Sequence, residues 1–283
     1  MSLSYHCLRF VNVSEWNPIS PEWQRLVSQL PANEKNQVMR YMFTKDQNLA
    51  LASRLLQRQL IHELFHVQYD AIEIKRTPEN KPYWRRPNAL LASPQWNYNV
   101  SHHGTIVAIV SNSRTLVGVD VVRLTDRPHD KTSAAEFFRA FAGHFNPSEW
   151  DYIRGVASVE DEDSQYTRFY QLWSLKEAYI KAVGVGMGFA LLRAEFVRGN
   201  AARWELILDG QRARHWHFTC TQLDSMHLVS VAYGPYSAMW MPKTSSLFSE
   251  GEPYSIVHAA DIEESEALEG WQQWRLQDLL QSS

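Results

Sequence analysis

The chain has 283 residues, 45% hydrophobic and 12% aromatic, so it can bury a large core and global disorder is not expected. Its net charge of −3 argues against a nucleic-acid binder, which usually carries a basic excess. Two distant cysteines, Cys7 and Cys220, argue against a disulfide scaffold and a zinc site. With no signal peptide and no run of about 20 apolar residues, we expect a soluble cytosolic protein without a membrane partner.

The first 115 residues mix strand and helix patterns, and we expect them to form an N-terminal α+β subdomain, 1–115. Alternating apolar residues mark the strands, and apolar residues three and four apart mark a long helical stretch. In chain order the pattern predicts a strand at 5–13, helix from Pro31 to 65, a strand with a proline turn at 71–84, a β-rich piece at 96–104, and a hairpin of 105–110 with 116–122, turned at 111–114.

Residues 116–240 are predicted to form a second, similar α+β subdomain. Its longest pattern is a helix that starts near Gln165 and ends by Gly184. Hairpins and long single helices favour an α+β fold over a regular βαβ series, and no nucleotide-binding glycine motif occurs. The other predicted elements are a helix before Pro147, an acidic loop at 159–165, and strands at 194–197, 203–209, 216–223 and 227–234.

Residues 241–283 read as an acidic, serine-rich tail. They hold eight acids against Lys243 and Arg275, a net charge of −6, which leaves +3 for the first 240 residues. We expect "WQQWRLQDLL", residues 271–280, to form one short helix that docks weakly or not at all, so the tail should be dispensable.

Asp120 is a carboxylate on an otherwise apolar strand, "LVGVDVV". Gly118, Asp120 and Val122 share one face of it, and Gly118 leaves space beside the acid. Because a buried carboxylate without a partner is costly, a cationic group should meet Asp120. An ordinary salt bridge or a strand-end cap explains this residue as well as a ligand site does.

The helix predicted after Gln165 carries Trp173, Glu177 and Lys181 on one stripe, four residues apart. A solvent-facing Glu–Lys pair, worth about 0.3–0.5 kcal/mol, accounts for this spacing. The tryptophan on the same stripe and three alternating glycines at the helix end favour instead a wall where a ligand docks closely. The spacing alone leaves both interpretations open.

The stretch "NVSHHG" gathers Asn99, Ser101 and His102 just before a glycine turn. Adjacent histidines on a strand point to opposite faces, so a zinc site is not expected. With Arg76 and Lys81 from the predicted turn, these side chains suit phosphate or ribose. Two carboxylates without thiols suit Mg²⁺, which takes substrate phosphates as ligands, so the three regions together indicate phosphoryl-group chemistry without a P-loop.

Two separated motifs carry a family resemblance. "GVD" followed about fifty residues later by "WSLKEAYIK" resembles the signature of the 4'-phosphopantetheinyl transferases of the surfactin-synthetase-activating type, and (W/F)xxKEAxxK is its specific part. "NVSHHG", "KRTPENKPYW" and "RYMFTKDQNLALASRLLQRQL" extend the resemblance over roughly Pro31 to Gly188. It implies two similar α+β subdomains related by a pseudo-twofold, with coenzyme A in the cleft between them. The implied reaction moves the phosphopantetheine arm to a serine of an acyl, peptidyl or aminoadipate-type carrier domain and releases 3',5'-ADP.

The resemblance also assigns roles by position. Asp120 and Glu177 would ligate Mg²⁺, and Lys181 would contact the coenzyme A phosphates. Glu177 would act as the general base on the carrier serine, directly or through water. The residues implied to hold the nucleotide, its 3'-phosphate and the pyrophosphate are Arg76, Lys81, Asn99, Ser101 and His102.

The chain departs from the family at two positions. Many bacterial members have a third acid two residues after the first, and here Val122 stands there, so a water would complete the metal's ligands. The family's arginine near the 3'-phosphate corresponds to Gln37, with Lys35 and Arg40 nearby. Residues 136–150 correspond to the region where family members meet their carrier protein.

Two other classes of protein stay open. A module that binds coenzyme A or a carrier domain without turnover should lack Asp120 or Glu177, and both are present. The second class is a Mg²⁺-dependent phosphohydrolase, and only the family motif argues against it. Since the family's long single chains commonly act as monomers, a monomer is expected.

Overall fold

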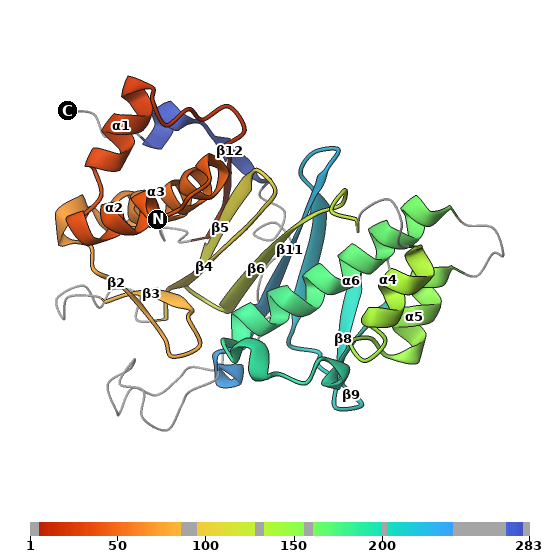
Figure 1. The fold of residues 1–283 in the computed structure, drawn as a ribbon. Helices are drawn as coiled ribbons and strands as arrows, with labels where there is room; N and C mark the ends of the chain where they lie inside the picture. The colour runs from red at the N-terminus through yellow and green to blue at the C-terminus, as the bar shows by residue number, and fades with distance from the viewer. Residues whose placement is uncertain are drawn as a thin grey trace.

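The structure, a computed structural model, describes residues 6–85, 95–127, 133–155, 161–199, 203–239 and 270–279. It has two halves, each with one 22-residue helix laid across a sheet: α3, Thr44–Phe65, and α6, Glu162–Val183 (Figure 1). Separate sheets with single long helices confirm the predicted α+β class. No helix in these ranges is long and apolar enough to cross a bilayer.

The first half packs its helices on a four-stranded sheet of order β12-β1-β5-β4. The helical stretch predicted from Pro31 is interrupted, because the chain is extended at Phe43 (φ −99°, ψ 137°). The elements are the helices α1 Pro21–Ser28, α2 Ala32–Met39 and α3, the sheet strands β1 Cys7–Asn12, β4 Asn97–His103, β5 Ile106–Asn112 and β12 Gln272–Trp274, the separate hairpin of β2 Ile74–Arg76 and β3 Pro82–Trp84, and the 3-10 turns η1 Tyr69–Ala71 and η7 Leu276–Leu279.

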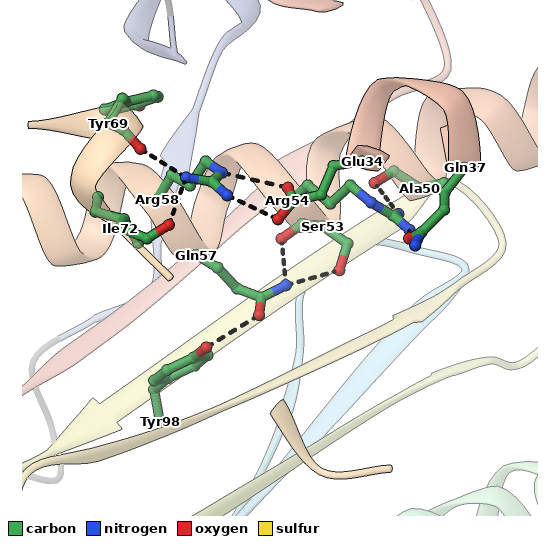
Figure 2. Close-up of polar contacts among 10 residues, drawn as sticks. All are labelled: Glu34, Gln37, Ala50, Ser53, Arg54, Gln57, Arg58, Tyr69, Ile72 and Tyr98. Carbon is green, nitrogen blue, oxygen red and sulfur yellow. Dashed lines mark hydrogen bonds and ion pairs between the residues drawn. The ribbon is translucent and has the colours of Figure 1, made fainter. Parts of the chain in front are cut away.

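Buried polar side chains fasten α3 to its neighbours (Figure 2). The guanidinium of Arg58, 1% exposed, donates to the carbonyls of Tyr69 (2.7 Å) and Ile72 (3.0 Å) and pairs with Glu34 of α2 (2.7 Å). With its Nε also donating to Glu34, four of its N–H groups meet protein acceptors, which makes a buried cation tolerable. This network fixes α2 and the chain after α3 relative to the long helix.

The second half lays α6 across the sheet β10-β11-β6, and Gly118 of β6 makes the close approach possible. A Cβ on Gly118 would lie 2.1 Å from the carbonyl oxygen of Ala178 and 2.3 Å from the amide nitrogen of Ala182. Glycine is therefore required here for the backbone of α6 to rest on the strand. Asp120, two residues on, faces the same helix.

Helix starts in the second half differ from the predictions. α6 begins at Glu162 rather than near Gln165, because the Asp161 carboxylate accepts the N–H of Ser164. Pro147 begins a helix, α5, as suits its fixed φ. The elements are α4 Ala134–Ala140, α5 Pro147–Arg154, α6, the strands β6 Leu116–Arg123, β7 Ala194–Arg198, β8 Trp204–Leu208, β9 Gln211–Arg212, β10 His217–Gln222 and β11 His227–Gly234, and the 3-10 turns η2 Gly186–Gly188, η3 Leu191–Arg193 and η5 Tyr236–Ala238.

The two halves meet at β4 and β6, and the predicted hairpin of β5 with β6 is wrong. β5 pairs with β1 and β4, whereas β6 pairs with β11 in the other sheet. The valine face of β6 instead packs against the first sheet in a shared core, so the layers run α3, first sheet, second sheet, α6 (Figure 1). This shared core contains Leu8, Ile106, Ala108, Val110, Val117, Val119, Val121, Val229, Val231 and Tyr233.

The C-terminal segment packs into the first half, so the prediction of a weakly docked helix at 271–280 is wrong. β12 pairs in parallel with β1, and the guanidinium of Arg9 lies 4.0 Å from the ring centre of Trp274. Leu279 is fully buried in the first core. Strand pairing with distant residues overrode the local helical pattern, and the described end of the tail belongs to the folded body.

Candidate functional site

Asp120 lies at the centre of a buried polar cluster between the halves. Its Oδ1 accepts from Lys181 Nζ (2.6 Å) and from Ser101 Oγ (3.3 Å), and Lys181 also donates to Ser101 Oγ (2.9 Å). The expectation that a cation meets Asp120 is therefore confirmed, and the cation is Lys181. The second oxygen, Oδ2, is buried without a hydrogen-bond partner in the described chain. Such an atom is costly unless a ligand completes it.

Glu177 lies one helical turn before Lys181 on α6. Burial raises its pKa above the usual value, the negative charge of Asp120 raises it further, and Lys181 lowers it. The charges of the two carboxylates therefore influence each other across the two elements. Their repulsion favours a cation or a proton between them.

A divalent cation of the magnesium type fits these residues. Among the described residues no three His, Cys, Asp or Glu side chains gather into a metal-binding group. Mg²⁺ is usually held by one or two carboxylates together with waters and substrate phosphates, and does not require a cage of protein ligands. The buried, partnerless Oδ2 of Asp120 with Glu177 beside it matches this donor set.

Lys176, the other lysine of the "KEAYIK" stretch, belongs to a different part of the helix. Its Nζ pairs with Glu149 of α5 (2.8 Å) and donates to the carbonyls of Leu191 and Ala194. Glu149 in turn accepts the N–H of Phe196 (2.9 Å). Lys176 therefore anchors α6 to α5 and β7 and does not reach the Asp120 cluster.

Every second side chain of β4 accepts a backbone N–H from β6, always twenty residues further along. We call these four contacts the β4–β6 ladder. They are Asn97 Oδ1 from Val117 (3.0 Å), Asn99 Oδ1 from Val119 (2.9 Å), Ser101 Oγ from Val121 (3.3 Å) and His103 Nδ1 from Arg123 (3.0 Å). Two predicted ligand residues, Asn99 and Ser101, thus join the halves.

His102 points away from the ladder and is accessible to solvent. Partial desolvation lowers its pKa, the charges of Lys181, His103 and Arg76 lower it further, and the carboxylate of Asp46 opposes this by raising it. Charges from three elements therefore reach His102, which indicates that the start of α3, the β2–β3 hairpin and the end of α6 face one region. Arg76 is exposed there and donates to the carbonyl of Asn80 (2.9 Å), which holds the hairpin turn.

Lys81 is directed into the protein. Its Nζ donates to the carbonyl of Ala182 at the end of α6 (2.8 Å), and burial lowers its pKa to about 7. This contact ties the β2–β3 hairpin to the second half. The role that the sequence suggests for Lys81, a phosphate contact, stays a prediction.

Arg54 was missed by the sequence reasoning. Its guanidinium donates to Gln37 Oε1 (2.8 Å) and to the carbonyl of Ala50 (2.9 Å), as Figure 2 shows. It lines a cavity of about 300 Å³ together with Gln37, Arg40 and Tyr41. The position of Gln37 in the family's arginine slot pointed to this place, and the 17-residue separation of Gln37 from Arg54 hid the partner.

Comparisons with known proteins agree on one family. The model "4'-phosphopantetheinyl transferase, N-terminal" matches residues 14–114, and the model "4'-phosphopantetheinyl transferase superfamily" matches residues 116–232. A phosphopantetheinyl transferase of Thraustochytrium is 36% identical over 81% of this chain and 78% of its own length. The rat L-aminoadipate-semialdehyde dehydrogenase-phosphopantetheinyl transferase is 35% identical over 77% of this chain and 71% of its own. A crystal structure of holo-[acyl-carrier-protein] synthase from Thermotoga maritima aligns with a TM-score of 0.32 and 19% identity over 42% of this chain and 64% of that one.

Proposed function

This chain belongs to the 4'-phosphopantetheinyl transferase superfamily, and from that premise we propose that it transfers the phosphopantetheine group of coenzyme A to a serine of an apo carrier-protein domain. The Asp120–Ser101–Lys181 cluster, with its buried partnerless Oδ2, is the observation that carries this proposal. Where the two halves meet, the cluster offers one cation, Lys181, and one carboxylate oxygen that receives no hydrogen bond from the described chain.

Asp120 and Glu177 are the residues that would hold Mg²⁺. When bound, Mg²⁺ supplies positive charge that stabilises the pyrophosphate as negative charge develops on it. Lys181, whose side chain is 30% exposed, would add a second positive charge at the phosphates. The raised pKa of Glu177 suits a group that takes up a proton during the reaction.

The reaction is a displacement at phosphorus. The carrier serine oxygen attacks the phosphorus that bears the pantetheine arm, and Glu177 accepts the serine proton directly or through water. The bond from that phosphorus to the bridging oxygen breaks, and 3',5'-ADP leaves with the electron pair. Lys181 stabilises the charge on the departing phosphate.

Cationic and polar side chains of both halves would hold coenzyme A. Arg76, Ser101 and His102 are suited to the nucleotide phosphates, since they face the region of Lys181. The cavity beside Arg54 and Arg40 suits the 3'-phosphate, where Gln37 replaces the family's arginine. Lys81 would contact the phosphates from the β2–β3 hairpin, as the resemblance implies, while Asn99 acts through the strands that it joins.

The carrier domain would dock over residues 136–150, the region that corresponds to the carrier contact in the family. We propose that the protein acts as a monomer in the cytosol. Its two cysteines, Cys7 and Cys220, are not joined in a disulfide, as in proteins of a reducing compartment. The molar mass in solution, measured by light scattering with and without coenzyme A, tests whether the protein is a monomer.

Intact-mass analysis tests the function. The purified protein is incubated with coenzyme A, Mg²⁺ and a panel of apo acyl, peptidyl and aminoadipate-type carrier domains. We expect one carrier serine to gain the phosphopantetheine mass with equimolar 3',5'-ADP. Cleavage of coenzyme A with an unchanged carrier would indicate a hydrolase, and binding without cleavage would indicate a binding module.

A further inference from the structure

One edge of β6 pairs with β11, and the N–H groups on its other edge donate to side chains of β4. Successive N–H groups of a strand point to opposite edges, so β11 can accept only alternate N–H groups of β6. Those of Val117, Val119 and Val121 lie on the other edge, in the buried core between the halves. Buried N–H groups need acceptors, and β4 provides them through the β4–β6 ladder.

The ladder sets the register between the halves. β4 and β6 belong to different sheets, which do not pair through backbone hydrogen bonds. Side chains of β4 alternate between two faces, so a slip of one residue would turn every acceptor away from β6. The constant offset of twenty residues therefore fixes which residue of the first half lies opposite each residue of the second.

This register positions the Asp120 cluster. Ser101 accepts the N–H of Val121 and also contacts Asp120 and Lys181, so one hydroxyl is both a rung of the ladder and a member of the cluster. Asn99 forms the neighbouring rung, directly before Asp120, and is only 3% exposed. Its Oδ1 is already used by Val119.

On the basis of the proposed function, we propose that Asn99 is a positioning residue and not a coenzyme A ligand. It keeps β6 in register with β4, so that Ser101 meets Asp120 and Lys181. Its contribution to transfer passes through these three side chains.

Two variants matched in size test this role. Asn99→Leu removes the acceptor of the Val119 N–H, whereas Asn99→Asp keeps it and adds negative charge. The first measurement is hydrogen exchange at the Val119 amide without substrate. We expect protection to be lost in Asn99→Leu and kept in Asn99→Asp.

The second measurement separates turnover from binding. We expect kcat to fall by about 10²-fold in Asn99→Leu, since small misplacements in a site cost this much, and the Kd for 3',5'-ADP to change by less than about threefold. Because Asn99→Asp keeps the acceptor of the Val119 N–H, we expect kcat to fall less in Asn99→Asp than in Asn99→Leu. A ligand contact would give the reverse order, because the added charge of Asn99→Asp would repel phosphate and weaken 3',5'-ADP most.

That reverse order, or full Val119 protection in Asn99→Leu, overturns the inference. If Asn99→Leu does not fold, Asn99→Asp decides alone: protected Val119 with unchanged 3',5'-ADP binding supports the role, and weakened 3',5'-ADP binding overturns it. Exchange at Val119 does not depend on turnover. A wild-type protein without transferase activity would therefore refute the proposed function and leave this test in place.

Discussion

Two lysines of α6, five residues apart, each pair with a carboxylate of another element, and the two pairs differ in how completely their hydrogen bonds are satisfied. Lys176 and Glu149 are 1% and 0% exposed, and each makes further hydrogen bonds to backbone groups. Lys181 and Asp120 are 30% and 8% exposed, and Asp120 keeps an oxygen without a partner in the described chain. We call these the closed pair and the open pair.

The difference teaches which pair can change partners. Burial lowers the pKa of Lys176 and raises that of Glu149, while their mutual attraction opposes both shifts, so neither charge is stable without the other. The open pair has solvent access and spare acceptor capacity, so a metal ion or a phosphate can enter it. The motif therefore combines Lys176, which fastens α6 to its neighbours, with Lys181, which belongs to the candidate site.

The largest effect is expected from Glu177→Gln beside the open pair. The amide keeps the size of the side chain and removes the base and one ligand charge, so transfer should fall by about 10²–10⁴-fold. Single-turnover rates at saturating Mg²⁺ measure this, with circular dichroism as the control for folding. Near-normal transfer would remove Glu177 from the mechanism.

Replacing each lysine by methionine separates the two pairs. Lys176→Met should cost about 3–5 kcal/mol of unfolding free energy, because Glu149 is left buried and unpaired. Lys181→Met should cost about 1–2 kcal/mol, since solvent reaches its position, but should abolish most transfer. Urea denaturation and the transfer assay measure both.

A second substitution checks the closed pair. Adding Glu149→Gln to Lys176→Met removes the orphaned charge and keeps an acceptor for the Phe196 N–H, so part of the lost stability should return. Equal stability losses from the two lysine substitutions would contradict the distinction between the pairs.

The cations around the open pair should discriminate between ligands. Arg76→Ala and His102→Ala should each weaken coenzyme A by about 1.5–3 kcal/mol through loss of a charge-assisted contact. If they contact the 3'-phosphate, dephospho-coenzyme A should be affected less. Calorimetric titration with both ligands measures this, and equal weakening would assign the residues to the pyrophosphate.

Lys81 extends the comparison to a third lysine near α6, with the smallest expected effect. Its pKa of about 7 in the folded protein is below the ordinary value of 10.5, so between these values the unfolded chain binds one proton more. Stability should therefore rise with pH across this window and be lost as pH falls toward 7. Lys81→Met should flatten that rise.

Chemical denaturation between pH 7 and 9.5 measures the difference between the two proteins. Taking the difference cancels groups that both share, such as Cys220, whose pKa burial raises to about 11. Parallel curves for wild type and Lys81→Met would show that Lys81 is charged in the folded state.

The need for a cation beside Asp120 could be predicted from the sequence because strand alternation is local, whereas the identity of that cation, Lys181, could not, because it lies 61 residues away. Strand alternation put Asp120 and Gly118 on one face, and helical spacing put Glu177 and Lys181 on another, so each needed a partner of known type. The closed pair could not be predicted from the sequence. Glu149 lies 27 residues before Lys176, and the periodic pattern does not say which buried charges meet.

The failures have one physical origin, contacts between residues distant in sequence. The β5–β6 hairpin was inferred from a short turn, and tertiary packing of the valine face decided otherwise. Arg54 beside Gln37 and Lys81 at the end of α6 likewise depend on how elements approach. The strand pattern of β4 also did not indicate that its alternating polar residues accept backbone N–H groups of β6, twenty residues further along.

The return of the C-terminal segment has a consequence for biosynthesis. β1 leaves the ribosome before the other strands of its sheet, yet its parallel partner β12 follows roughly 260 residues later. Until then one edge of β1 stays open and the core position of Leu279 is vacant. The first half therefore matures after the second has been made, and a nascent chain stalled near residue 240 would present an exposed strand edge to chaperones and proteases.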